Sequence, residues 1–459
     1  MLRRLAELEA RVAQLEALNR AKDARIKDLE QQLKAHSKNS HYPPSRDLFV
    51  KREPKPCFRR NRQRSNGGQV GHTGISLERV EKVDAVVKIR EEQCRCGHNF
   101  KPSDSKLVES RQELDIPPVN LKVTEYQLYE TECPKCHLIT KGQFPEHIKS
   151  PVQYGPTLRT QCVLLNVDYK MPLEKIVQWM EDLIGVRINE SSIVNWVNQL
   201  YRKCANTEDF IKRELLKSKV LHVDETGIKI GGQTYWNHVA CNERYTLQYA
   251  HLKRGSKAWE NNASILQNYK GILVHDCWSS YFKIDKARHS LCGAHLSREF
   301  TALVESDSRW AVEMKKLLIG LHEANKATNK RNRQAIYKKY DSIIRKGFKE
   351  EPPPIKAGLR GKAKNTKGYN LLLRLKKHRE ATLAYAFDPK IPFTNNQAER
   401  DIRHCKTKLK VSGCFRSTQG AQAYLRISSV ISTLRKNGIH IFNEMIHAFQ
   451  KTSYCLKLT

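Results

Sequence analysis

The first 35 residues carry the hydrophobic pattern of a coiled coil. Apolar residues recur at alternating spacings of three and four, as in a helix that packs lengthwise against another helix. The a and d positions are Leu5, Leu8, Val12, Leu15, Asn19, Lys22, Ile26, Leu29 and Leu33. A polar residue at an a position, such as Asn19, favours a two-stranded register. A lone amphipathic helix packed on the protein body fits the same stripe, but a linker follows this segment and we therefore favour self-association.

Residues 36–80 have no hydrophobic period and are punctuated by Pro and Gly, which predicts a linker. Four of its arginines are candidate contacts to a phosphate backbone: Arg59, Arg60, Arg62 and Arg64. A merely solvated tether has the same composition, so both interpretations stay open.

Residues 81–150 alternate apolar and polar positions at 83–89 and 121–129, which predicts strands. Two cysteine pairs accompany them: Cys94 and Cys96, then Cys133 and Cys136. Four thiolates in turn-forming surroundings predict a zinc-ribbon-like site with a structural Zn²⁺. The first pair has one intervening residue where two are usual, so His98 is an alternative ligand. Four unrelated thiols are the competing interpretation.

Residues 151–212 return to helical spacing. One apolar face comprises Leu173, Ile176, Val177 and Met180, and another comprises Ile193, Trp196, Val197 and Leu200. Gly185 ends the first helix and Asn189 caps the second. This outline predicts a helix-turn-helix that binds DNA, although ordinary helical hairpins share it.

Residues 213–300 alternate strand and helix signals, and two of the strands end in an acid. Val220–Val223 leads into Asp224, and Ile272–His275 leads into Asp276. The segments 235–240 and 245–250 lie between these two strands in the sequence and are expected to pair with each other as a hairpin. Strand ends converge at one edge of an α/β sheet, where two aspartates are able to bridge divalent cations. An aspartate after a strand is more often a cap or turn residue, so neither aspartate taken alone would indicate a metal ligand.

Residues 301–390 are predicted to be helical and basic, and residues 391–459 helical. One apolar stripe of the last region comprises Ala398, Ile402, Cys405 and Leu409; the stripe beside it comprises Glu399, Arg403 and Lys406. Asn395 or Asn396 is the expected cap. The second stripe fits a metal ligand flanked by groups that bind DNA phosphates. It also fits salt bridges on a solvated helix.

Cys292 and His295 lie three positions apart at a predicted helix start. We expect them to have a structural role rather than to bind a metal.

The charge balance narrows the class of partner. The chain has 82 Lys and Arg against 48 Asp and Glu, a net charge of +34. Such an excess favours a polyanion, although membrane-surface and ribosome-associated proteins look similar. No apolar run of 18 residues and no signal peptide is visible, and the 13 cysteines do not resemble a secreted disulfide scaffold. We expect a soluble, cytoplasmic protein without a membrane partner.

Four strings in order resemble the IS66 family of bacterial insertion-sequence transposases. They are His222–Thr226, Val274–Tyr281, Cys292–Arg298 and Asn395–Arg400. The strings Ser37–Ser45 and Gly68–His72 resemble the N-terminal part of the same family.

The resemblance implies an RNase H-like core whose catalytic triad is Asp224, Asp276 and Glu399, holding two Mg²⁺ or Mn²⁺ ions. It also implies a zinc-binding domain at the two cysteine pairs. A basic residue seven positions after the glutamate falls on Lys406. Arg400, Arg403 and Lys406 are the expected phosphate-binding residues of this helix.

We therefore predict a multi-domain α+β transposase. The expected parts are a coiled coil (1–35), a linker (36–80), a zinc-ribbon-like domain (81–150), a helix-turn-helix-like domain (151–212) and an RNase H-like core (213–300 and 391–459) with a helical insertion (301–390). It is expected to bind the terminal inverted repeats of its element, then to cleave and join double-stranded element and target DNA at the nucleoid. Accessory proteins of the element are further candidate partners. A catalytically silent DNA-binding derivative and a nuclease that does not join ends are the alternatives.

Overall fold

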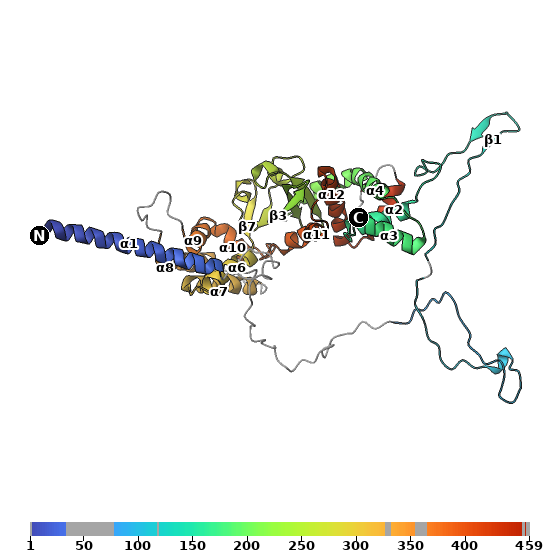
Figure 1. Ribbon diagram of the computed structural model, residues 1–459, viewed down its shortest axis with the longest axis horizontal. Coiled ribbons are helices and arrows are strands. Elements are labelled where there is room, and N and C mark those ends of the chain that lie inside the picture. The colour runs from blue at the N-terminus through green and yellow to red at the C-terminus, as the bar shows by residue number, and fades with distance from the viewer. Residues whose placement is uncertain are drawn as a thin grey trace. The chain divides into compact units, whose positions relative to one another are not determined.

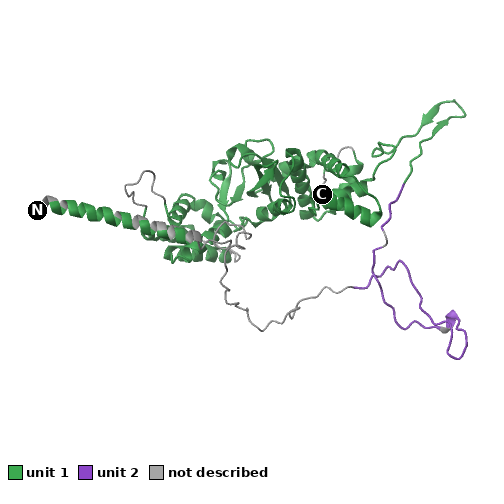
Figure 2. Ribbon diagram, in the orientation of Figure 1, with its two compact units in different colours: residues 1–50, 124–459 green, residues 51–123 purple. Residues whose placement is uncertain are grey.

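The computed structural model describes residues 2–33, 78–116, 119–325, 332–353, 365–451 and 455 (Figure 1). The chain divides into two units, residues 51–123 and the remainder, which are described separately (Figure 2). Among the described helices, none combines the length and the apolar character that crossing a bilayer requires. The linker arginines Arg59, Arg60, Arg62 and Arg64 lie outside the described residues.

The N-terminal segment is one continuous helix, α1 (Leu2–Leu33). Exposed apolar residues at its a and d positions are Leu5, Leu8, Val12, Leu15, Ile26 and Leu29. A coiled-coil partner would cover this stripe. Self-association through α1 remains a prediction.

The strands expected at residues 83–89 and 121–129 are absent, and these predictions were wrong. Val86, Ile89 and Val123 are each at least 74% exposed, so no second layer among the described residues covers the alternating apolar side chains. A strand pattern needs such a covering layer to be stabilised. Regular pairing here is limited to β1 (Glu130–Glu132) with β2 (Ile139–Lys141) and to a bridge between Gln93 and Asn99.

Residues 151–212 form the expected helices. They are α2 (Pro156–Val167), α3 (Leu173–Ile184), α4 (Glu190–Lys203) and α5 (Ala205–Leu216). Gly185 ends α3 in the left-handed conformation at φ 67°, a geometry that glycine adopts without a Cβ penalty. The Asn189 side chain caps α4 by accepting a hydrogen bond from the Ser191 N–H at 2.9 Å. DNA recognition by this helical pair remains a prediction.

The core of the chain is a mixed five-stranded sheet in the order β5-β4-β3-β6-β7. Its strands are β3 (Val220–Ile230), β4 (Gln233–Cys241), β5 (Thr246–His251), β6 (Ile272–His275) and β7 (Arg288–Leu291). β3, β4 and β5 are antiparallel neighbours, whereas β6 and β7 run parallel to β3. This order and these directions are consistent with an RNase H-like core.

One strand is longer than expected. β3 does not end at Val223 but continues through Asp224 to Ile230, because every residue from His222 onward pairs with β4. Gly231 and Gly232, with φ of 54° and 81°, form the tight turn into β4. Asp224 therefore lies within a strand and not after one.

Helices from the C-terminal region cover the sheet. α11 (Asn396–Ser412) packs on β3 and β4, and α12 (Thr418–Lys436) packs on β5. α10 (Arg379–Phe387) packs against β7, and α13 (Ile441–Gln450) packs against α2. The buried stripe of α11 is the predicted one, with Ala398 and Ile402 against Val239 and Cys241.

The helical insertion has its own hydrophobic core. Its helices α7 (Arg309–Asn325), α8 (Arg333–Glu350) and α9 (Lys367–Lys377) share this core with α6 (Gly293–Val304), which begins before the insertion. Trp310, Tyr340 and Leu372 are fully buried in this second core. The insertion is thus a packed unit and not an extended loop.

Candidate active site

The parallel pairing of β3 and β6 brings two aspartates to neighbouring positions. Val220 pairs with Ile272 and His222 with Val274. The same register continued by two residues places Asp224 opposite Asp276. Cys277 follows at φ 75°, and this sharp turn lets the Trp278 N–H donate to Asp276 Oδ1 at 3.0 Å. Positive φ is unusual for a residue with a side chain, and such backbone strain clusters at functional sites.

Crowded negative charge perturbs the first aspartate. Burial, with added repulsion from Glu225 and Asp276, raises the pKa of Asp224 to about 8. Lys406 on α11 acts in the opposite direction, so its positive charge lies close enough to stabilise the carboxylate. Carboxylates that repel one another in this way fit a site for hard divalent cations, which prefer oxygen ligands.

A second buried acid, Glu225, follows Asp224 in β3 and bonds to residues outside the strand. Glu225 is 8% exposed, and its carboxylate accepts hydrogen bonds from Arg254 Nε at 2.8 Å and from the Tyr281 hydroxyl. The Arg254 guanidinium in turn lies 3.8 Å from the centre of the Trp278 ring and 4.7 Å from that of Trp236. Sequence reasoning assigned no role to this cluster, although Glu225 and Tyr281 stand inside the recognisable strings.

Asn395 fastens α11 to β3 next to the aspartates. Its side-chain NH₂ donates to the Val223 carbonyl at 2.7 Å, and its Oδ1 lies 2.9 Å from His222 Nδ1. Contrary to the expectation of a cap, the Asn395 side chain makes no capping hydrogen bond to α11. It holds the start of the helix on the strand instead. Glu399 follows one helical turn later, about 6 Å along the axis.

The Glu399 side chain points to α6 and does not join Asp224 and Asp276 in one set of ligands. Its Oε1 lies 3.6 Å from His295 Nδ1 and 3.7 Å from Arg298 Nη2. Among the described residues, the one group of three potential ligands whose atoms all lie within 4.8 Å is Cys292, His295 and Glu399. Asp224 and Asp276 are not in it.

The Glu399 carboxylate has unused coordinating capacity. Within the described part of the chain, its buried Oε1 accepts no hydrogen bond. An oxygen in that position fits a metal ligand better than a surface salt bridge. The two aspartates at the sheet edge offer the oxygen ligands that Mg²⁺ prefers.

The basic residues of α11 differ in their surroundings. Arg403 and Lys406 are exposed, and Arg400 Nη2 donates to Gln397 Oε1 at 2.7 Å. Arg374 of the insertion pairs with Glu299 of α6. Burial opposes the charge of the Arg374 guanidinium, but Glu299, then Cys277 and then Asp276 outweigh burial and raise its pKa. The insertion therefore places a cation near the second aspartate, which sequence spacing gave no means to foresee.

Each cysteine pair forms a knuckle of its own. In one unit, the Cys94 N–H donates to the His98 carbonyl at 2.8 Å, and Gly97 turns the chain at φ 91°. In the other, the Cys133 N–H donates to the Leu138 carbonyl at 3.0 Å, at the tip of the β1–β2 hairpin.

Backbone amides face the sulfurs of both knuckles. Hydrogen bonds from the backbone of His98 and the side chain of Cys94 lower the pKa of Cys96. Backbone hydrogen bonds from Lys135 and Cys136 lower the pKa of Cys133. Thiolates stabilised in tight turns are the usual zinc ligands. His98 contributes its carbonyl to the turn.

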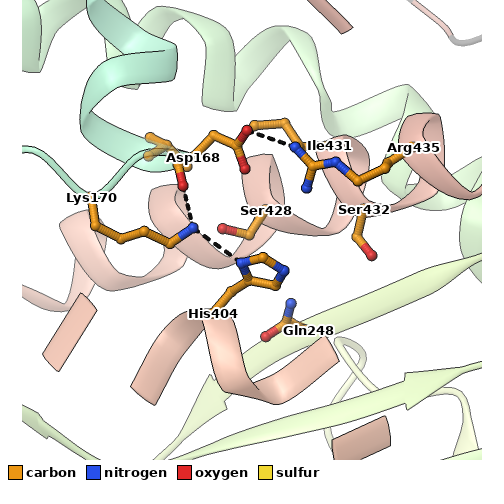
Figure 3. A pocket seen from close by; sticks show the side chains of 9 residues that line it. Asp168, Lys170, Gln248, His404, Ser428, Ile431, Ser432 and Arg435 are labelled. Atoms are coloured by element: carbon orange, nitrogen blue, oxygen red, sulfur yellow. Dashed lines mark hydrogen bonds and ion pairs between the residues drawn. The ribbon is translucent and has the colours of Figure 1, made fainter. Parts of the chain in front are cut away.

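A polar crevice between α2, α11 and α12 is not a substrate site (Figure 3). Its cavity of about 10 Å³ has room for a single water molecule. Lys170 Nζ lies 3.0 Å from His404 Nδ1, and Arg435 Nη2 donates to Asp168 Oδ2 at 2.7 Å. The cavity is too small for a substrate and its charged groups are paired, so we interpret the crevice as a packing contact.

Comparison with known families agrees with this arrangement. A profile described as the transposase IS66 family matches residues 151–423, more than half of the chain. A profile for the zinc-finger binding domain of transposase IS66 matches residues 91–137, which include both cysteine knuckles. A family of unknown function, DUF6444, matches residues 1–78. No curated protein shows a significant match. The chain belongs to the IS66 family of transposases, which are DDE-type polynucleotidyl transferases.

Proposed function

We propose that the chain binds the terminal inverted repeats of an insertion sequence and catalyses both DNA cleavage and strand transfer, with Asp224, Asp276 and Glu399 as its catalytic acids. The observation that carries this proposal is the β3–β6 register, which sets Asp224 opposite Asp276 while Asn395 fixes the Glu399 helix to the same strand. The raised pKa of Asp224 supports it, because such repulsion is relieved by a bound cation.

Two Mg²⁺ or Mn²⁺ ions would supply activation of the attacking oxygen and stabilisation of the leaving oxygen. Asp224 and Asp276 would hold these ions between two adjacent strands. Glu399 would complete the site by turning from His295 and Arg298 toward the aspartates. A glutamate side chain has three rotatable bonds, so a change of rotamer at the start of α11 would redirect its carboxylate.

The reaction consists of two in-line displacements. A water oxygen first attacks the phosphodiester at the element end and releases a 3′-hydroxyl. That hydroxyl then attacks a phosphodiester of the target DNA, so that the element end is joined to the target 5′-phosphate and a 3′-hydroxyl of the target strand is released. Lys406 and Arg403 would neutralise the phosphates near the scissile bond, and Arg400 would bind farther along the backbone. No protein side chain acts as the nucleophile, so no covalent protein–DNA link forms.

Further parts of the chain would serve DNA binding and assembly. Cys94, Cys96, Cys133 and Cys136 are the proposed ligands of a structural zinc ion, since each pair forms a knuckle and one family profile covers both. The α3–α4 pair and the linker arginines are the proposed DNA contacts. The exposed stripe of α1 is the proposed self-association surface. Because its substrate is DNA, we place the protein at the bacterial nucleoid.

The test is strand transfer with an oligonucleotide that bears the inverted repeat. Asp276→Asn is expected to abolish cleavage and joining in Mg²⁺ while changing repeat binding by no more than a few-fold. Asp285→Asn is the matched control, because Asp285 is an exposed aspartate beyond the site. A mutant that still joins ends would show that the acids are misassigned. Cleavage without joining by the unmodified protein would identify a nuclease, and repeat binding with neither step would identify a silent derivative.

A further inference from the structure

Three potential metal ligands meet between the starts of two helices. Cys292 precedes α6, His295 lies in its first turn, and Glu399 lies in the first turn of α11. A sulfur, an imidazole nitrogen and a carboxylate oxygen from these residues all lie within 4.8 Å of one another. The cysteine is 1% exposed, whereas the glutamate side chain is 29% exposed, so the group is closed on the protein side and open on the other.

The donor set selects a different metal from the one expected at the aspartates. Mg²⁺ requires oxygen ligands and is not held by a thiolate. Thiolate, imidazole and carboxylate together are ligands of Zn²⁺ and similar thiophilic cations. Three protein ligands leave one tetrahedral position for water, as in exchangeable rather than closed structural sites.

The backbone around the cluster holds the ligands in place. The Gly293 N–H donates to the Phe393 carbonyl at 2.7 Å, and a Cβ at Gly293 would lie 2.2 Å from the Phe393 ring. This close approach fixes the start of α6 to the segment before α11. Asn395 fixes α11 to β3 on the other side. Little rearrangement is needed for a cation to bind between the two helix starts.

The sulfur of Cys292 has the surroundings of a metal-binding thiolate. It accepts the Asn395 backbone N–H at 3.1 Å. Backbone N–H groups of His295 and Ala294 also face this buried sulfur. Backbone amides also face the sulfurs of Cys96 and Cys133 in the two knuckles. The third member, Glu399, offers a buried Oε1 that accepts no hydrogen bond within the described residues.

We propose that Cys292, His295 and Glu399 form a second metal site, for a thiophilic divalent cation of the zinc class. Occupation of this site would hold Glu399 against α6 and away from Asp224 and Asp276. The binding itself needs only the geometry of the cluster. Its inhibitory consequence rests on the proposed function, in which Glu399 must join the aspartates.

Cobalt binding to the full-length protein tests the site directly. The protein is prepared with its knuckles loaded with zinc, and Co²⁺ is titrated while thiolate-to-cobalt charge-transfer absorption is recorded. The unmodified chain is expected to show this band. Cys292→Ser is expected to lose it, and Cys277→Ser, a neighbouring half-buried cysteine outside the cluster, is expected to keep it.

A second variant covers the case in which Cys292→Ser does not fold, as judged by circular dichroism. His295→Ala retains the thiolate and is expected to weaken cobalt binding by at least ~10-fold, since even outer partners of metal ligands contribute that much. No band in the unmodified chain, or an equal band and affinity in both cluster variants, would overturn the site.

The regulatory consequence has its own measurement. Added Zn²⁺ is expected to inhibit Mg²⁺-dependent cleavage, and His295→Ala is expected to need ~10-fold more zinc for equal inhibition. Equal zinc sensitivity in the two proteins would refute the inhibition. Cobalt binding requires no DNA, and cleavage without zinc does not require the cluster to hold a metal. Failure of this site and failure of the proposed function are therefore separate results.

Discussion

At the scale of single residues, Asp224 is the acid whose ionisation the fold opposes most clearly. Burial and the carboxylates of Glu225 and Asp276 raise its pKa from 3.8 to about 8. A metal-free chain at neutral pH therefore keeps this carboxyl protonated. Cation binding must displace that proton, so the affinity for Mg²⁺ should rise with pH up to about 8.

The same shift predicts a pH-dependent cost in stability. Because the folded-state pKa exceeds the unfolded value, the stabilisation by the protonated carboxyl is complete below pH 3.8 and is lost as pH rises to about 8. In magnesium-free buffer, Asp224→Asn should raise the free energy of unfolding by about 2–4 kcal/mol at pH 8. Near pH 4 the difference should vanish.

Urea unfolding followed by tryptophan fluorescence at both pH values measures this difference. Asp285→Asn, which alters an exposed aspartate, should change stability by less than about 0.5 kcal/mol at either pH. A destabilised Asp224→Asn chain at pH 8 would show that the carboxylate is held by hydrogen bonds instead of being strained by its neighbours.

At the scale of elements, the start of α6 depends on a glycine. A Cβ at Gly293 would overlap the Phe393 ring, which packs just before the Glu399 helix. Gly293→Ala should destabilise the chain by about 1–3 kcal/mol, the usual cost of overpacking. It should also lower strand transfer, because Phe393 must shift together with the segment that leads into α11.

Gly320 supplies the control for this prediction. It lies in the middle of α7, and nothing stands within 4 Å of the Cβ that alanine would add. Gly320→Ala should therefore stabilise the chain by about 0.5–1 kcal/mol through helix propensity alone. If both substitutions behave alike in thermal unfolding, the contact between Gly293 and Phe393 does not constrain the helix start.

The helix α1 permits a separate test of assembly. Leu15 belongs to the exposed apolar stripe, whereas Ala10 lies on the opposite, f-position side. Leu15→Asp should shift the full-length protein toward monomer in sedimentation equilibrium, because association would bury the charge in the coiled-coil seam and remove its hydration. Ala10→Asp should leave the distribution unchanged. Equal effects, or a monomeric unmodified protein, would contradict self-association through α1.

Sequence patterns predicted the elements better than their ends and contacts. Helical spacing identified the buried stripe of α11, and short apolar runs identified β3 and β6. The same patterns failed at residues 83–89, where alternation without a covering layer forms no strand. They also ended β3 too early, because the pairing of Asp224–Ile230 with β4 depends on a partner that lies beyond the local sequence.

The site was predictable to a similar extent. Residue spacing and family resemblance together led to Asp224, Asp276 and Glu399, but neither indicated how the three are held. The Asn395 side chain was expected to cap a helix and instead bonds to β3. The approach of Glu399 to His295 and Arg298 depends on tertiary packing between α6 and α11. Such long-range contacts leave no periodic signal in the sequence.

At the scale of the whole molecule, the proposed active site draws on segments from three distant parts of the chain. β3 carries Asp224, the residue after β6 carries Asp276, and α11 carries Glu399 beyond an insertion with its own core. The insertion also brings Arg374 close enough to Asp276 for their charges to interact. The central claim is that these three acids bind the same pair of metal ions.

Manganese binding, measured by electron paramagnetic resonance on the full chain with uncleaved element-end DNA, tests that claim most directly. We predict that Asp224→Asn, Asp276→Asn and Glu399→Gln each weaken Mn²⁺ binding by at least ~10-fold, whereas Asp285→Asn binds Mn²⁺ as the unmodified protein does. Normal Mn²⁺ affinity in Glu399→Gln would contradict this claim, because the glutamate would then interact only with residues of α6 and would not bind the metal ions.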